Sequence, residues 1–251
     1  MTSTMATPVQ HIPKISHREA RDLATTEHHR ALDLLRSLDD EEWSKPTDCP
    51  AWDVRAMAGH MLGMMEFTCS VREFVHVIRA GGKAAGDGPT IDGMTEVQVA
   101  DRAGLGVDEL LERIAAAGPR AARRRYRVPR PLRALPMKQE MPKGVETWRL
   151  GYLFDIILTR DPWMHRIDLS RATGRELLLT PEHDGRVVSD VVAEWARRHG
   201  QSFTLTLTGP AGGTFTHGNG GEDITIDAVQ FCRTVSGRGS GPGLLGEPVP
   251  F

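Results

Sequence analysis

The spacing of apolar residues changes well past the middle of the chain. Up to about Gly174, apolar residues recur every three or four positions, as on the buried face of an α-helix. Beyond that point, Ser202–Thr208 alternates polar and apolar residues, which is the pattern of a half-buried β-strand. With 251 residues the chain is long enough for one large domain or two modest ones. The change of period therefore predicts an α+β protein, with a helical front followed by a smaller mixed domain.

The predicted organisation has three parts. Residues 1–15 are polar, carry two prolines and are expected to form a loose arm. A bundle of about four helices is expected over 16–175 and a small α+β domain over 176–251. The expected helices of the bundle are 16–38, 53–79, 96–117 and 145–158. The second domain is expected to contain helices at 181–199 and 227–236 and strands at 202–208, 214–217 and 223–226.

Composition narrows the class of partner. The formal net charge of -2 gives no global attraction to nucleic acid or to an anionic membrane. No run of about 18 apolar residues and no signal-peptide core is present. Cys49, Cys69 and Cys232 are odd in number and lack CxxC spacing, so we expect reduced thiols rather than a disulfide framework. These features predict a cytoplasmic protein that acts on a small molecule. We expect it to be a monomer or homodimer.

His60 lies on an apolar stripe of the second expected helix. Met57 and Met64 are three and four residues away, and Phe67 continues the row, so the imidazole is expected to point into the bundle. One interpretation is a core histidine that hydrogen-bonds a neighbour, and the other is a metal ligand. A second group of ligands is needed to favour the metal.

Asp161 and His165 are spaced i and i+4, so on one helix both side chains face the same way and can reach one ion. An alternative exists because Asp161 directly precedes Pro162. Asp at the N-cap followed by Pro at the first helical position is a common helix start. The two interpretations are compatible if the helix bends at the proline. Without such an arrangement, Pro inside a helix costs about 3 kcal/mol.

Two stretches resemble a known family. Thr47-Asp-Cys-Pro-Ala-Trp52-Asp-Val-Arg-Ala-Met-Ala-Gly-His60-Met and Arg160-Asp-Pro-Trp-Met-His165-Arg-Ile-Asp168-Leu look like the mycothiol-dependent maleylpyruvate isomerase family. That family belongs to the DinB-like four-helix-bundle superfamily. The tail, from Asp227 through Arg238 to Phe251, is similar to a C-terminal domain related to sterol carrier proteins. The resemblance covers nearly the whole chain.

The resemblance implies a divalent metal, usually zinc, held by His60, Asp161 and His165. The acid is usually Glu, and Asp161 is one methylene shorter. Two imidazoles and one carboxylate would leave an open coordination position, as in catalytic zinc sites. In the family this position activates mycothiol, a small thiol of actinobacteria, for isomerisation or S-transfer. The family's C-terminal domain also contributes an arginine to the site, which implies a catalytic role for Arg238.

Other functions stay open at this stage. Asp168 could orient His165 or form a surface ion pair, and the seven arginines of Arg120–Arg133 could bind a carboxylated substrate or form a solvated connector. A hydrolase that uses metal-bound water is one alternative to the thiol-dependent enzyme. A non-catalytic binding protein that has lost its metal is another. The distances between His60, Asp161 and His165 are the observation that bears most directly on this choice.

Overall fold

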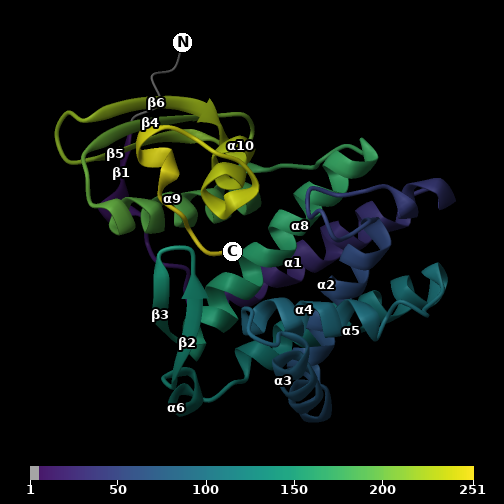
Figure 1. Cartoon of the computed structure of the whole chain (residues 1–251). Helices are drawn as coiled ribbons and strands as arrows, with labels where there is room; N and C mark the ends of the chain where they lie inside the picture. Colours follow the sequence, from purple (N-terminus) through teal and green to yellow (C-terminus); the bar gives the residue numbers. More distant parts are fainter. Residues whose placement is uncertain (1–5) are drawn as a thin grey trace. The chain divides into compact units, whose positions relative to one another are not determined.

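A computed structural model describes residues 6–251 and divides the chain into two compact units. The helical unit is His17–Leu177. The second unit is Leu178–Phe251 together with the described residues up to Ser16. Most residues are helical and the largest sheet lies in the second unit, so the predicted α+β class is confirmed (Figure 1). In the described part of the chain, no helix is both long and apolar enough to cross a membrane.

Four long helices form the bundle of the helical unit (Figure 1). These are α1 (His17–Arg36), α2 (Val54–Cys69), α5 (Val107–Tyr126) and α8 (Leu158–Thr173). Both α1 and α2 pack against α5 and against α8, so the helices form a closed ring around one core. That core is apolar and rich in methionine, and it includes Leu35, Val54, Met57, Met61, Met65, Leu110, Ile114, Ala121 and Leu169.

The predicted start of α2 is confirmed, but its predicted length is wrong. The Asp53 carboxylate accepts a hydrogen bond from the amide of Ala56 at 2.7 Å and caps the helix. The helix ends at Cys69 because Ser70 is extended and its hydroxyl caps the next helix by accepting from the amide of Glu73. The expected single helix 53–79 is therefore two helices, α2 and α3 (Val71–Ala84).

Helices α3 and α4 (Thr90–Ala100) follow α2 in the chain and precede α5. They pack against each other as a hairpin, and both contact α2. Gly81 and Gly93 allow this contact: a Cβ atom added to Gly93 would lie 2.1 Å from the carbonyl oxygen of Gly81. The expected helix 96–117 is wrong because the chain leaves the helical path between α4 and α5, where Gly104 and Gly106 lie. Helix α5 starts only after the second of these glycines.

The segment between α5 and α8 departs most from expectation. Helix α5 continues to Tyr126 through half of the arginine-rich stretch, and α6 (Arg130–Arg133) follows. Next come strands β2 (Pro136–Met141) and β3 (Gly144–Arg149), which pair antiparallel. The expected helix over 145–158 is thus wrong in its first five residues, since Glu146 and Trp148 turn inward alternately with exposed neighbours. The short helix α7 (Leu150–Tyr152) then leads into a π-helical turn at Leu153–Ile157 and α8.

The second unit is built on a four-stranded sheet of order β1-β5-β4-β6 (Figure 1). Strand β4 (Phe203–Thr208) pairs antiparallel with β5 (Gly213–His217) and parallel with β6 (Glu222–Asp227), so the three predicted strands are confirmed. Helices α9 (Arg186–His199) and α10 (Ala228–Arg233) complete the core with buried Val191, Trp195 and Phe231. π-Helical turns at Pro181–Gly185 and Thr234–Arg238 adjoin α9 and α10.

Part of the predicted loose arm is ordered. Strand β1 (Thr7–Pro8) pairs parallel with β5, and Val9 in the following 3-10 turn is buried. Arg186 also donates a hydrogen bond to the carbonyl of Pro13 at 2.8 Å. Residues 1–5 of the expected arm lie outside the described residues. The prediction of a loose arm is wrong for residues 7–11, because a segment this short that pairs with a distant strand has no periodic pattern of its own.

Candidate metal centre and adjoining cavity

The path of α8 determines where Asp161 and His165 point. The helix begins at Leu158, directly after the π-helical turn, and Asp161 lies inside its first turn. The N-cap interpretation of Asp161 is therefore wrong, and Pro162 lies within a helix. Since proline has no amide hydrogen, the carbonyl four residues earlier, at Leu158, loses its helical donor. Asp161 and His165 share one helical face, one turn apart.

His60, Asp161 and His165 converge. The Oδ1 atom of Asp161 lies 3.3 Å from Nε2 of His165 and 3.8 Å from Nε2 of His60. One donor atom from each of the three residues lies within 4.8 Å of the others. The two imidazoles are buried, whereas the side chain of Asp161 keeps 20% of its surface exposed. The group is therefore enclosed on the imidazole side and accessible at the carboxylate.

Trp52 covers the two imidazoles. Its ring stacks on His60 with centroids 4.8 Å apart, and its centroid lies 5.9 Å from that of His165. The indole is placed by the loop before α2, where Thr47 donates its hydroxyl hydrogen to the carbonyl of Trp52 at 2.8 Å. A large apolar ring therefore shields both imidazoles, which strengthens electrostatic interactions within the group.

The three residues shift one another's charge states. Burial lowers the pKa of His60. Burial alone would also lower the pKa of His165, but the adjacent charge of Asp161 raises it well above its ordinary value. Burial opposes ionisation of Asp161, yet the charge and hydrogen bonds of His165 and His60 lower the pKa of this carboxyl. Without a bound ion, the group is therefore an Asp161–His165 ion pair beside a neutral His60.

Asp168 and Cys49 lie on the far side of His165. Nδ1 of His165 is 3.4 Å from Oδ2 of Asp168, a fully buried carboxylate one helical turn further on. The proposed orienting role of Asp168 is therefore geometrically available, and its alternative as a surface group is wrong. A Cys49 sulfur also lies within 4.8 Å of donor atoms of both residues. The sequence patterns considered above did not single out Cys49, because its contact with His165 joins segments far apart in the chain.

The donor set fits a divalent ion. Tetrahedral ligands at about 2.0–2.2 Å from zinc lie roughly 3.4 Å from each other. The separations of 3.3 and 3.8 Å from Asp161 are close to that value. Nε2 of both imidazoles faces Oδ1 of Asp161, so the three donor atoms are directed toward one another. His60, Asp161 and His165 are thus chemically and geometrically suited to one ion.

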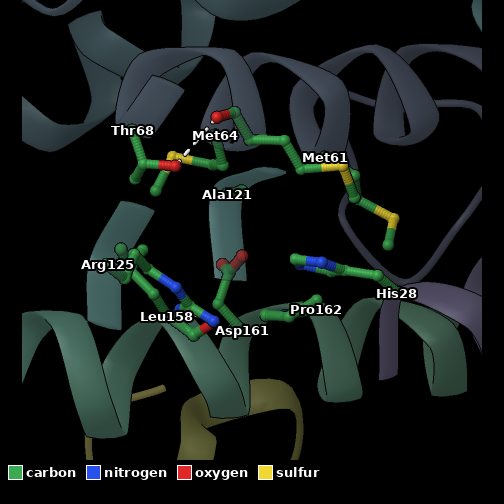
Figure 2. Close-up of a pocket in the computed structure, with 10 residues that line it drawn as sticks. His28, Met61, Met64, Thr68, Ala121, Arg125, Leu158, Asp161 and Pro162 are labelled. Carbon is green, nitrogen blue, oxygen red and sulfur yellow. Dashed lines mark hydrogen bonds between the residues drawn. The ribbon is translucent and has the colours of Figure 1, made fainter. Parts of the chain in front are cut away.

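A narrow cavity adjoins Asp161 within the helical unit (Figure 2). Its walls come from α1, α2, α5 and α8, and its volume of about 20 Å³ is of the order of a single water site. Apolar atoms make up most of the wall. The lining residues are His28, Met61, Met64, Met65, Thr68, Ala121, Arg125, Leu158, Asp161 and Pro162. The cavity therefore has room for about one water molecule beside the carboxylate.

Arg125 and His28 are the polar residues of this cavity besides Asp161 and Thr68. Nη1 of Arg125 donates to the Leu158 carbonyl, the one left without a helical donor by Pro162. Nδ1 of His28 lies 2.9 Å from the Gly118 carbonyl, and because a carbonyl only accepts, Nδ1 carries the hydrogen. Nε2 of His28 is then an acceptor. Burial lowers the pKa of His28 to about 4, so this ring is neutral at pH 7.

Helical spacing could have revealed both residues. Ala24, Ala31 and Leu35 lie on the buried face of α1, and His28 continues that row. On α5, Ile114, Ala121 and Arg125 share the buried face in the same way. The signal that identifies Arg125 is a charged residue at a core position of the helix. The prediction from sequence grouped it with the exposed arginines around it.

Arg238 belongs to the second unit, at the end of the π-helical turn Thr234–Arg238. The preceding residue, Gly237, has φ +87°, which a side chain other than glycine rarely adopts. Arg238 is half-buried. Its catalytic role stays a prediction.

Comparison with known proteins identifies the family. The family model described as mycothiol maleylpyruvate isomerase N-terminal domain matches residues 24–170, more than half of the chain. The chain belongs to this family. The match includes His60, Asp161 and His165 and confirms the predicted family for the bundle. It ends before the second unit, so the predicted likeness of that unit to sterol carrier proteins stays a prediction.

Two crystal structures share the fold of this maleylpyruvate isomerase family member. One is of a mycothiol-dependent maleylpyruvate isomerase, with a TM-score of 0.57 and 15% identity over 98% of this chain and 100% of that chain. The other is of a histidine-to-alanine mutant of such an isomerase, with a TM-score of 0.56, 14% identity and the same coverage. At this identity the likeness establishes the fold. No curated protein sequence matches the chain.

Proposed function

We propose that this protein is a metal-dependent enzyme that uses mycothiol to isomerise a small polar substrate or to transfer the thiol to it. The observation that carries the proposal is the convergence of His60, Asp161 and His165, with 3.3 and 3.8 Å between the carboxylate and the two imidazoles. Membership of the mycothiol maleylpyruvate isomerase family supports the thiol and the reaction class. Zinc is the proposed ion because two imidazoles and one carboxylate are typical ligands of catalytic zinc.

Each residue of the site has a proposed task. Neutral His60 and His165 and ionised Asp161 would hold the ion, and Asp168 would accept from Nδ1 of His165 and keep Nε2 turned toward Asp161. Trp52 would exclude water from the imidazole side. The ion would supply Lewis acidity that favours the thiolate form of a thiol at neutral pH. The accessible side of Asp161 would be where the thiol enters.

The proposal also assigns a role to Arg238 in the second unit and a location to the enzyme. Arg238 would bind a polar part of the substrate, since arginine donates hydrogen bonds in a planar fork. We place the enzyme in the cytoplasm, where the thiols of the three cysteines would remain reduced. An Arg238→Ala variant that keeps its metal and the full mycothiol-dependent rate would contradict the proposed substrate-binding role of Arg238.

Metal content tests the central claim. After reconstitution with zinc, the wild-type protein should hold about one equivalent, and the His60→Ala variant less than about 0.2 equivalent. His29→Ala is the control, because His29 is an exposed histidine on α1. A wild-type protein that takes up no zinc would overturn the proposal.

Turnover tests the thiol. With maleylpyruvate as the trial substrate, the rate should require mycothiol and be lost in His60→Ala. Turnover that is unchanged without thiol would instead indicate a hydrolase that uses metal-bound water. Ligand binding that survives His60→Ala, with no turnover in the wild type, would indicate a non-catalytic binding protein.

A further inference from the structure

Helix α3 exposes an apolar stripe at the periphery of the helical unit (Figure 1). Four apolar residues of this helix, spaced i, i+3, i+4 and i+7, share one face. They are Val71, Phe74, Val75 and Ile78, and their exposed fractions are 82%, 44%, 38% and 42%. Single apolar residues on a protein surface are ordinary, whereas a contiguous row of them indicates an interaction site.

A row of basic residues flanks this apolar stripe. Arg72, Arg79 and Lys83 are exposed and follow one another at helical spacing on one side of it. In the part of the chain that the structure describes, none of these three side chains makes a hydrogen bond or an ion pair. Glu73 is the acidic residue of α3, and it contacts Arg102 at 2.6 Å, away from the stripe. The outer face of α3 is therefore apolar along one side and positively charged along the other.

The charge pattern does not suit a second copy of the chain. In an antiparallel α3 pair related by a twofold axis, the apolar stripes would match each other. The same axis, however, would place the two basic rows on the same side of the interface. Arg72 of each copy would then lie within about one helical turn of Arg79 of the other, and like charges across an interface disfavour association. The partner that fits this face must be negatively charged.

An anionic lipid bilayer complements both halves of the face. A helix that is apolar on one side and rich in arginine and lysine on the other lies in the plane of the interface, with its apolar side chains at the acyl boundary. Its basic side chains then reach the lipid phosphates, and each one raises the membrane affinity about fivefold. The chain as a whole has a net charge of -2, so this attraction is local to α3.

We propose that the outer face of α3 binds an anionic lipid bilayer, with Val71, Val75 and Ile78 at the acyl boundary and Arg72, Arg79 and Lys83 on lipid phosphates. The contact is peripheral and reversible, because α3 has 14 residues and is too short to cross the hydrocarbon core. It uses none of the residues assigned to the metal, so it is independent of the proposed enzymatic function.

Co-sedimentation of the full chain with lipid vesicles tests the proposal. The wild-type protein should bind vesicles of equal parts phosphatidylglycerol and phosphatidylcholine at least about tenfold more tightly than vesicles of phosphatidylcholine alone. The double variant Arg72→Gln with Arg79→Gln should lose about tenfold or more of that affinity. Val71→Ser combined with Ile78→Ser should lose about fivefold, because it removes apolar side chains from the acyl boundary.

Arg18→Gln with Arg36→Gln is the matched control. Both arginines are exposed on α1, and replacing them removes the same amount of charge, so the vesicle affinity should stay within about twofold of the wild type. Urea denaturation checks that each variant is folded. If the apolar double variant does not fold, Val71→Ser alone replaces it, since Val71 is the most exposed residue of the stripe.

Four outcomes overturn the proposal. They are no binding to the anionic vesicles, equal binding to both kinds of vesicle, equal losses in the α3 arginine variant and the α1 control, and an unchanged affinity in the apolar variant. Sedimentation velocity without lipid tests the second copy as the alternative occupant. A dimer that is abolished by Val71→Ser with Ile78→Ser, in a protein that does not bind vesicles, would assign the face to self-association instead.

Discussion

Arg166 and Arg125 are both buried in the helical unit, but Arg166 lies against a carboxylate and Arg125 does not. Nε and Nη2 of Arg166 donate to the two oxygens of Glu27, at 2.6 and 3.2 Å, and both side chains are at most 2% exposed. Arg125 donates to a backbone carbonyl and faces a cavity. The Glu27 carboxylate balances the charge of Arg166 directly, whereas Arg125 is influenced by the more distant charges of Asp155 and Asp161. Two arginines of similar burial therefore differ in how the fold balances their charge.

The largest expected effect comes from breaking the complete pair. Glu27→Ala removes the carboxylate that pairs with buried Arg166, and we expect a loss of about 3–5 kcal/mol in the free energy of unfolding, measured by urea denaturation. Asp22→Ala is the control on the same helix, because Asp22 pairs with Arg21 at the surface, and it should cost less than about 1 kcal/mol. Similar losses in the two variants would contradict a structural role for the buried pair.

Acid should destabilise the helical unit through His28, which lies beside Arg125 in the cavity wall. The pKa of His28 is about 4 in the folded protein, against 6.5 in a model compound. Since the folded pKa is the lower one, its contribution to stability is complete above pH 6.5 and falls as the pH drops toward 4. The full loss is about 3 kcal/mol.

His28→Asn keeps a donor for the Gly118 carbonyl but does not titrate, so its free energy of unfolding should fall less steeply than that of the wild type between pH 6.5 and 4. Urea denaturation at a series of pH values measures both slopes. Parallel slopes would show that protonation of His28 makes no difference to stability.

The smallest expected effect is the change in the free energy of unfolding when Arg125 is replaced. Arg125→Gln should change the free energy of unfolding by no more than about 1 kcal/mol, because it retains a donor for the Leu158 carbonyl and removes a buried charge. The same denaturation experiment measures it beside Glu27→Ala. A loss as large as that of Glu27→Ala would mean that Arg125 is a structural residue and would remove the contrast between the two arginines.

Local patterns predicted the parts of the molecule that are governed by local periodicity. The alternation in Phe203–Thr208 gave its strand, and the apolar row through Met57 gave the inward direction of His60. The i,i+4 spacing placed Asp161 and His165 on one face. Each of these depends only on residues within two helical turns or one strand.

The errors came from features that are decided over longer distances or by single residues. The β2–β3 hairpin follows a proline-rich segment, and its strands are recognisable mainly from their pairing. Ser70 ended α2 by capping α3, which a continuous apolar row conceals. The compensation of Pro162 by Arg125 joins residues far apart in the sequence. The reason that Pro162 is tolerated is visible only in the folded bundle. There, Arg125 of α5 donates a hydrogen bond to the Leu158 carbonyl, which the proline leaves without a helical donor.

The stacking of Trp52 on His60, at 4.8 Å between centroids, gives the site an optical reporter of its own. Indole emission responds to protonation and to changes of charge on an adjacent imidazole, so events at the centre should alter the fluorescence of this tryptophan. Subtracting the signal of a Trp52→Phe variant would isolate it from the other four tryptophans. Occupancy of the centre could then be followed in real time, without a label or a coloured substrate.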